Sequence, residues 1–302
     1  MNLHYFSLIK DALLKVWPEH GRVVEKSLAQ RDESLLVFTE QISSMIYKII
    51  SDDLESYCLS YKWTCEMLNQ EEIYFRRSGK YRFSTLSEVE NVVYHDHSFM
   101  NKYVKGLLLT QILWTNHINT IWAYNNFLES QPIKSIIEIG PGHGLLVALA
   151  GIKGIKDITV WDISESSLLE TKKNLTNILP GIEVNYLQVD ALNVSKLKSL
   201  DKKYDAIVLS EVLEHIEFPQ TILKNLREVM NPDSCIFINI PLNCPAPDHI
   251  YYLDKADDVV ELVQGAGLQT ANVQQYPLTG YTLEAALKRR FTISVCLTAT
   301  AH

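Results

Sequence analysis

Apolar residues in the first 130 positions recur with the period of an α-helix. The first such series, at steps of three or four residues, is Leu3, Phe6, Ile9, Leu13 and Val16. The segment from Leu35 to Ile50 repeats this spacing. Residues spaced in this way lie on one face of a helix and pack against neighbouring helices. Residues 1–130 are therefore predicted to form an all-α region.

After Pro132 the pattern changes to short β-branched runs that alternate with amphipathic segments. Five runs have the composition of strands: Ser135–Ile139, Asp157–Trp161, Ile182–Val189, Tyr204–Leu209 and Cys235–Ile240. Strands that alternate with helices at this spacing are typical of βαβ units and a parallel sheet. Residues 131–302 are therefore predicted to form an α/β domain, with a boundary near residue 130.

The end of the chain departs from this alternation. Leu268–Tyr276 and Phe291–Thr298 have the composition of strands, and the connection between them contains a short helical segment, Thr282–Arg290. A connection of this kind allows the last strand to insert antiparallel beside its neighbours.

Three glycines occur within five residues directly after the first predicted strand, in the stretch EIGPGHGLLVALA. Gly140, Gly142 and Gly144 lack a Cβ atom, so the turn can adopt positive φ angles and a flat ligand can lie against its backbone. The spacing G-x-G-x-G differs from the dinucleotide fingerprint G-x-G-x-x-G, and Glu138 upstream would repel a pyrophosphate. A carboxylate here suits a ligand with an amine or a sulfonium, and S-adenosylmethionine has both.

Polar residues also follow the next three predicted strands. They are Asp162 in TVWDIS, Asp190 in YLQVDAL, and Ser210 with Glu211 in DAIVLSEVLEHI. A carboxylate at Asp162 can accept both hydroxyls of a ribose, and one at Asp190 can accept an adenine amino group. A helix N-cap is the competing role for Asp162, although Ser164 with Ser167 suits that role better.

The segments EIGPGHG, WDIS, VDAL and YDAIVLSEVLEHI together resemble the sequential motifs of class I S-adenosylmethionine-dependent methyltransferases. The resemblance covers the chain from about residue 132 to its end. It implies a Rossmann-like doubly wound seven-stranded sheet with the last strand antiparallel, preceded here by the all-α N-terminal cap region. It also implies S-adenosylmethionine as the cofactor.

This resemblance distributes the cofactor-binding residues over four strand ends. The implied set is Glu138, Gly140, Gly142, Gly144, Asp162, Ile163, Asp190, Ala191, Ser210 and Glu211. Glu138 and the first two glycines would contact the methionine end. Asp162 would bind the ribose, and Asp190 with Ala191 the adenine. Ser210 and Glu211 would form the loop beside the sulfonium. The motifs specify the cofactor and leave the acceptor open.

The acceptor pocket is expected from the helical region, which is rich in aromatic residues. The expected pocket residues are Tyr81, Tyr94, Trp114 and Asn243. Aromatic rings exclude water and hold cations by their faces, while packing between helices is the competing role for each ring. Asn243 belongs to a loop after the fifth strand in which three prolines oppose helix formation.

Histidines supply the candidate catalytic groups. His117, His215 and His249 are candidate general bases, with packing or capping as the competing role for His215 and His249. His95 and His97 flank Asp96, but two histidines with no third ligand nearby in the sequence are typical of a polar loop. No metal site is therefore expected.

Composition excludes several classes of partner. The 302 residues carry a net charge of -8, with a pI near 5.6, so no basic field attracts nucleic acid or an anionic membrane. The five cysteines contain no C-x-x-C pair, which argues against a disulfide framework and a zinc knuckle. The chain has no signal-like start and no long apolar run. We expect a cytoplasmic protein with a small-molecule partner, and the helical region is a candidate homodimer surface.

The first functional hypothesis is a methyltransferase of secondary or central metabolism that acts on a small molecule by in-line displacement at the sulfonium. A second hypothesis uses the same cofactor without an acceptor. Enzymes that resemble this family displace methylthioadenosine intramolecularly and release azetidine-2-carboxylate. An NAD-dependent oxidoreductase and a non-catalytic cofactor-binding scaffold are further alternatives. The glycine spacing disfavours the oxidoreductase, and the number of cofactor positions disfavours the scaffold.

Overall fold

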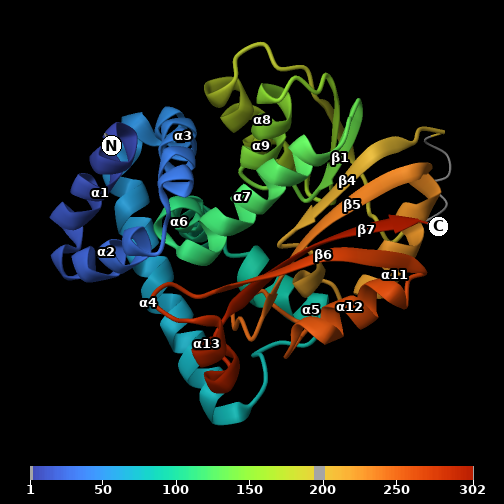
Figure 1. Cartoon of the computed structure of the whole chain (residues 1–302). Helices are drawn as coiled ribbons and strands as arrows, with labels where there is room; N and C mark the ends of the chain where they lie inside the picture. The colour runs from blue at the N-terminus through green and yellow to red at the C-terminus, as the bar shows by residue number, and fades with distance from the viewer. Residues whose placement is uncertain (1–2, 194–200, 302) are drawn as a thin grey trace. The chain divides into compact units, whose positions relative to one another are not determined.

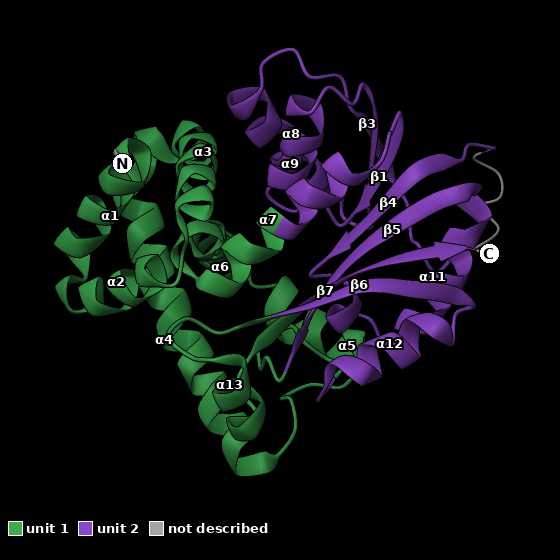
Figure 2. Cartoon of the chain, viewed as in Figure 1, with its two compact units in different colours: residues 1–122, 243–252, 276–294 green, residues 123–242, 253–275, 295–302 purple. Residues whose placement is uncertain are grey.

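The computed structural model describes residues 3–193 and 201–301, and Figure 1 shows its helices and strands. The chain divides into two compact units, each made of three segments (Figure 2). Unit 1 consists of residues 1–122, 243–252 and 276–294, and unit 2 of residues 123–242, 253–275 and 295–302. Both units are discontinuous in the sequence. The predicted boundary near residue 130 divides the chain only once, and it stays a prediction.

Unit 1 is helical, as the apolar periodicity predicts. Its helices are α1 (His4–Val16), α2 (Gly21–Ala29), α3 (Glu33–Ile50), α4 (Leu54–Ser78), α5 (Leu86–Val89), α6 (His97–Leu113) and α13 (Leu283–Arg289), with single turns at η1 (Pro18–His20), η2 (Ser51–Asp53) and η3 (Glu90–Tyr94). α7 (Thr115–Ser130) begins in unit 1 and continues into unit 2. The predicted face of α1 is buried through Phe6, Ile9 and Leu13.

Hydrogen bonds hold distant segments of unit 1 together. The guanidinium of Arg76 on α4 donates to the carbonyl oxygens of Arg289 and Arg290, at 2.5 and 2.9 Å. Carbonyls at the carboxyl end of a helix, here α13, need partners from outside the helix. The backbone N–H of Thr115 donates to Thr279 Oγ1 at 2.8 Å. The segment around α13 is therefore fixed to the N-terminal helices by hydrogen bonds that involve side chains.

A seven-stranded sheet has the order β3-β2-β1-β4-β5-β7-β6, and it belongs to unit 2 except at the ends of β6 and β7. The strands are β1 (Ser135–Ile139), β2 (Asp157–Asp162), β3 (Asn185–Gln188), β4 (Tyr204–Ser210), β5 (Met230–Leu242), β6 (Leu268–Pro277) and β7 (Ile293–Ala301). Neighbouring strands from β3 to β5 pair in parallel, and the last strand runs antiparallel. The predicted Rossmann-like doubly wound sheet is confirmed.

Helices cover both faces of this sheet. α8 (Leu145–Ile152) and α9 (Glu165–Ile178) lie on one face, and α11 (Pro219–Leu226) and α12 (Ala256–Gln264) lie on the other (Figure 1). The first six residues of α8 are all buried. Helices on both faces explain why the parallel strands are almost continuously apolar.

Two strands have bounds that differ from the predicted runs. β3 is shorter than Ile182–Val189, because its pairing with β2 begins only at Asn185, opposite Thr159. β5 is longer than Cys235–Ile240, because Met230 already pairs with Tyr204 of β4 across a register shift. Pairing with a neighbour decides both ends, and an apolar run does not contain that information.

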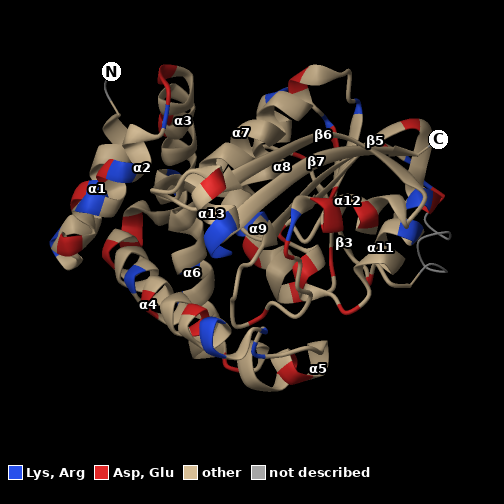
Figure 3. Ribbon diagram, turned by 60° about the horizontal axis from the view of Figure 1, so that its bottom comes forward, with Lys and Arg blue, Asp and Glu red and all other residues tan. Residues whose placement is uncertain are grey.

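Charges of both signs are interspersed on the helices. Figure 3 shows basic and acidic residues together on α1 and α4. On α4 the guanidinium of Arg76 lies 2.6 Å from the carboxylate of Glu72, one turn away. In the two described ranges no helix is both long and apolar enough to cross a bilayer.

Candidate functional site

The carboxyl ends of β1, β2, β4 and β5 meet at one edge of the sheet. Ile139, the last residue of β1, pairs with Trp161 of β2 and with Leu209 of β4. Leu209 in turn pairs with Ile238 of β5. Loops that leave parallel strands at such an edge form the ligand site of a doubly wound sheet. The ten predicted cofactor residues lie at strand ends of this sheet, within unit 2.

The glycine loop after β1 has the backbone that its sequence predicts. Gly140, Gly142 and Gly144 have φ angles of 64°, 51° and 79°, in the left-handed region that favours glycine. A Cβ atom at Gly142 would meet no atom within 4 Å, so the space beside this backbone is open. Thr171 on α9 donates from Oγ1 to the Gly142 carbonyl at 2.7 Å and holds the loop in place.

His143 lies inside the glycine loop, and its role was not predicted from the sequence. Desolvation lowers the pKa of its imidazole to about 4. Its Nδ1 accepts from the backbone N–H of Leu145 at 3.3 Å. The ring is therefore neutral near pH 7, and it adds no positive charge to a loop that is predicted to bind a cationic ligand.

Glu138 supplies a buried carboxylate beside this loop. Its residue is 5% exposed, and burial raises the pKa of the carboxyl group well above its ordinary value of 4.5. Oε2 has no hydrogen-bond partner among the described residues. Buried polar atoms are almost always paired in folded proteins, so this oxygen is a candidate acceptor for a ligand.

Asp162 at the end of β2 shapes the turn into α9. Its Oδ1 accepts from the N–H of Ser164 at 2.8 Å and its Oδ2 accepts from the hydroxyl of Ser167 at 2.6 Å. Ser164 is the N-cap of α9. A carboxylate has about four acceptor positions, so Asp162 retains acceptor capacity for ribose hydroxyls. Ile163 beside it is 61% exposed.

The loop after β3 is tied to the end of β2. The N–H of Val189 donates to the carbonyl oxygen of Asp162 at 3.0 Å, which joins the residue before Asp190 to the predicted ribose residue. Asp190 is exposed, and its Oδ1 accepts from the N–H of Leu192 at 2.9 Å. The amide of Asn225 donates to the carbonyl of Ala191 at 3.1 Å.

The turn after β4 is strained and fixed from β5. Glu211 has a φ angle of 54°, which is unusual for a residue other than glycine and is typical of functional sites. The amide of Asn239 on β5 donates to Glu211 Oε1 at 2.6 Å and to Ser210 Oγ at 3.3 Å. Asn239 was not predicted from the sequence, although a polar residue in the apolar run CIFINI was a signal for it.

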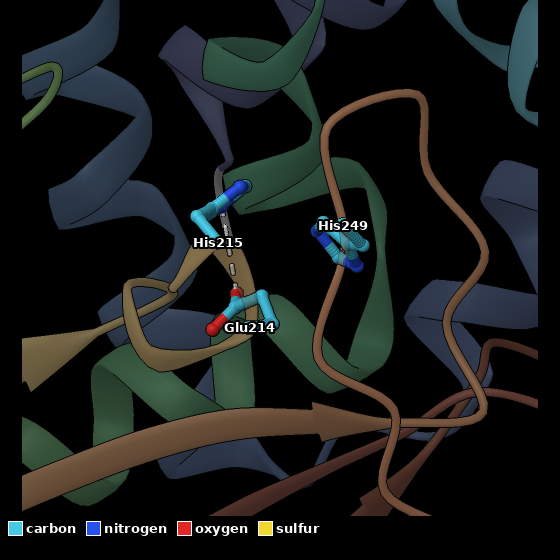
Figure 4. A group of neighbouring side chains, drawn as sticks. All are labelled: Glu214, His215 and His249. Carbon is cyan, nitrogen blue, oxygen red and sulfur yellow. Dashed lines mark ion pairs between the residues drawn. The ribbon is translucent and has the colours of Figure 1, made fainter. Parts of the chain in front are cut away.

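Glu214 and His215 follow on the turn η4 (Leu213–His215). Glu214 is only 1% exposed. Its Oε1 lies 3.8 Å from Nε2 of His215, an ion pair when the imidazole is protonated (Figure 4). The candidate base His215 therefore has a carboxylate as its neighbour.

The loop of residues 243–252 gathers three predicted residues within unit 1. The hydroxyl of Tyr81 accepts from the N–H of Cys244 at 3.0 Å, and its ring lies 6.1 Å from the imidazole of His249. His249 stands on this loop (Figure 4), with Nδ1 2.7 Å from the carbonyl oxygen of Cys244. Asn243 has a φ angle of 47° and accepts from the hydroxyl of Tyr252 at 2.7 Å.

Tyr94, Trp114 and His117 make other contacts in the same unit. Tyr94 packs against the apolar cluster of Val89, Val93 and Ile250. The indole of Trp114 donates to the hydroxyl of Tyr61 at 2.9 Å, and its ring lies 5.0 Å from that of His117. These contacts are the packing roles that compete with the pocket role.

Residues 116–279, more than half of the chain, match a family model described as a methyltransferase domain. The chain belongs to this methyltransferase family. The match begins inside α7, and it contains the glycine loop and the strand ends after it. The cofactor of this methyltransferase is S-adenosylmethionine.

Two curated relatives and one solved structure are similar to this methyltransferase. The ubiquinone biosynthesis O-methyltransferase of Rickettsia prowazekii (strain Madrid E) is 27% identical over 163 residues, 50% of this chain and 58% of that protein. The mitochondrial ubiquinone biosynthesis O-methyltransferase of Saccharomyces cerevisiae is 26% identical over 119 residues, 38% of this chain and 36% of that protein. The chain thus spans 36% to 58% of these relatives' length. The structure of an O-methyltransferase family protein from Burkholderia thailandensis matches with a TM-score of 0.50 and 12% identity. The match covers 86% of this chain and 72% of that one, and it shows a shared fold.

The described residues fit S-adenosylmethionine. The open space at Gly142 admits a flat group against the backbone, and Glu138 Oε2 is a buried acceptor without a protein partner among the described residues. A neutral His143 avoids repulsion of a cation. Glu138 would hold the methionine end and Asp162 the ribose. The backbone at Gly142 would lie against the cofactor.

Replacing Asn239 with leucine is expected to weaken binding of S-adenosylhomocysteine about tenfold, because a hydrogen bond to a charged group contributes about 1.5–3 kcal/mol. Loss of the amide releases the Glu211 carboxylate. Cys296→Ala is the control, since the thiol of Cys296 contacts the opposite atom of the same amide. Calorimetric titration of both variants measures the effect. Equal affinity of Asn239→Leu and the parent protein would show that Glu211 does not depend on this contact.

Proposed function

We propose that this chain transfers the methyl group of S-adenosylmethionine to a hydroxyl group of a small-molecule acceptor. The observation that carries the proposal is a loop of three left-handed glycines beside the buried acceptor oxygen of Glu138. Both curated relatives named above are O-methyltransferases, which supports an oxygen acceptor. The net charge of -8 supports a small molecule over a nucleic acid.

The cofactor supplies an electrophilic methyl group on its sulfonium. When bound, it would give this methyl group to the acceptor oxygen as the sulfur–carbon bond breaks, and the proton of the acceptor would pass to a base. The displacement needs no covalent catalyst, so the residues of the chain have to orient both molecules and exclude water. We assign Glu138 to the methionine end, Asp162 to the ribose, and Asp190 to the adenine.

His249 is the preferred base among the three candidates. A carbonyl oxygen only accepts, so His249 Nδ1, which faces the carbonyl of Cys244, carries the hydrogen, and Nε2 carries the lone pair of the neutral ring. In His117 the lone pair is on Nδ1 and the hydrogen on Nε2, because the amide of Gln111 donates to Nδ1 at 3.2 Å. The Nε2 atom of His215 faces the carboxylate of Glu214.

Mass spectrometry after incubation with S-adenosylmethionine and a panel of small phenols tests the proposal. The expected products are S-adenosylhomocysteine and a methylated phenol. His249→Ala is expected to lower kcat about 100-fold, the contribution typical of a general base, and to leave the affinity for S-adenosylhomocysteine unchanged. Release of methylthioadenosine and azetidine-2-carboxylate from the cofactor alone would show that the protein catalyses cyclisation and not methyl transfer. Tighter binding of NAD than of S-adenosylmethionine would contradict the cofactor site.

Three further expectations from the sequence stay predictions. They are the boundary near residue 130, the pocket role of Tyr81, Tyr94, Trp114 and Asn243, and a homodimer through the helical region. The structure gives each of the four pocket candidates packing or hydrogen-bond contacts within unit 1.

A further inference from the structure

Three residues form a row across the centre of the sheet. Glu138 of β1 pairs with Val208 of β4, and Val208 pairs with Phe237 of β5. Side chains alternate between the faces of a strand, so residues that pair across parallel strands point to the same face. Glu138, Val208 and Phe237 therefore project toward the same layer of helices.

Tyr124 on α7 packs against this row. Its ring lies 5.3 Å from that of Phe237 in an edge-on arrangement, and its side chain is completely buried. The hydroxyl has no hydrogen-bond partner among the described residues. A buried tyrosine hydroxyl normally has a partner, so the position of this one requires an explanation.

Tyr124 and Glu138 are within electrostatic reach of each other. Burial raises the pKa of the Tyr124 hydroxyl well above 10.0, and the carboxylate of Glu138 raises it further. The two groups nevertheless form no hydrogen bond with each other, and the Tyr124 hydroxyl and Glu138 Oε2 are each without a partner in the described part of the chain. Each buried polar group left without a partner costs about 1–3 kcal/mol. Two such groups on one face of the sheet indicate a polar ligand that satisfies both.

We propose that Tyr124 is a further cofactor-binding residue, whose hydroxyl oxygen and the Glu138 carboxylate together accept hydrogen bonds from the α-ammonium group of S-adenosylmethionine. This inference rests on the proposed placement of the methionine end beside Glu138. An ammonium group has three N–H donors and no acceptor, so it suits two acceptor oxygens. Tyr124 precedes the glycine motif by sixteen residues and belongs to no recognised part of it, which explains why the sequence did not reveal it.

Calorimetric titration with two ligands tests the proposal. S-adenosylhomocysteine contains the amino-acid end, whereas methylthioadenosine shares the adenosine and the thioether but lacks the amino acid. Tyr124→Phe removes only the hydroxyl, and it is expected to weaken S-adenosylhomocysteine about tenfold, as for one hydrogen bond to a charged group, with methylthioadenosine unaffected. Tyr204→Phe is the matched control, because Tyr204 is also buried but lies at the amino end of β4.

Thermal unfolding without ligand supplies a second measurement. Tyr124→Phe removes a buried hydroxyl that has no partner among the described residues, so the melting temperature is expected to stay the same or to rise while the affinity falls. Unchanged affinity for S-adenosylhomocysteine would overturn the role of Tyr124, and so would equal weakening of both ligands. A parent protein that binds neither ligand would instead refute the cofactor site itself, and the inference with it.

Discussion

Replacing Glu138 with glutamine is expected to weaken S-adenosylhomocysteine about 100-fold and to abolish the proton release that accompanies binding. The carboxylate is buried, and its pKa is raised well above 4.5 because it has lost its solvation. An ammonium group beside it favours the charged form and lowers that pKa again. Binding therefore releases a proton, and the affinity of the parent protein rises with pH up to the raised pKa of the carboxyl group in the free protein. Glutamine keeps the shape of the side chain but cannot titrate.

Glu138→Gln is expected to raise the stability of the ligand-free protein, although it weakens binding of the ligand. A carboxyl group whose pKa is raised in the folded state binds more protons in the folded than in the unfolded protein, so stability falls as the pH rises from about 4.5 through the folded pKa. Glu138→Gln removes this loss. The variant should therefore be more stable than the parent protein at neutral pH, and equally stable near pH 4, where both side chains are neutral.

Titrations in buffers with different ionisation enthalpies measure the proton release. For the parent protein the binding enthalpy should depend on the buffer, and for Glu138→Gln it should not. Glu261→Gln is the control, because Glu261 is an exposed glutamate on α12. A parent protein whose binding enthalpy is independent of the buffer would show that Glu138 does not change its protonation on binding.

The sheet and the glycine loop were predictable because their signals are local. Short apolar runs separated by helical segments determine a parallel sheet, and closely spaced glycines determine a left-handed turn. The φ angles of Gly140, Gly142 and Gly144 agree with this expectation. The ends of β3 and β5 were less accurate, since pairing with a neighbouring strand decides where a strand begins and ends.

The residues that the sequence did not reveal act through contacts with distant parts of the chain. Asn239 contacts Glu211 from the neighbouring strand, and Tyr124 joins the site through its place against Phe237 and its electrostatic interaction with Glu138. The two late segments of unit 1 join the early helices through contacts such as that of Arg76 with Arg290, 214 positions away. Neither spacing nor periodicity encodes such contacts, because both describe only a residue's neighbours in the sequence.

Replacing Gly140 with alanine is expected to reduce the affinity for S-adenosylhomocysteine by up to about 100-fold, because overpacking costs about 1–3 kcal/mol and about 1.4 kcal/mol is a factor of ten in affinity. A Cβ atom at this position would lie 2.9 Å from Val212 Cγ2. Val212 directly follows Glu211, so the overlap displaces the turn after β4 as well as the glycine loop. The φ angle of 64° adds about 1–2 kcal/mol of backbone strain for a residue other than glycine.

Gly154→Ala is the control that separates the effect of backbone strain from that of the overlap with Val212. Gly154 has a φ angle of 89°, and a Cβ atom there would meet nothing within 4 Å. Both variants should therefore lose stability through backbone strain, measured as the free energy of unfolding in urea, but only Gly140→Ala should lose affinity in a calorimetric titration. Equal affinities of the two variants would mean that the loop after β1 tolerates the displacement of Val212. The cofactor would then have to contact this edge of the sheet through the side chains of Glu138 and Asp162, without close approach to the backbone of Gly140.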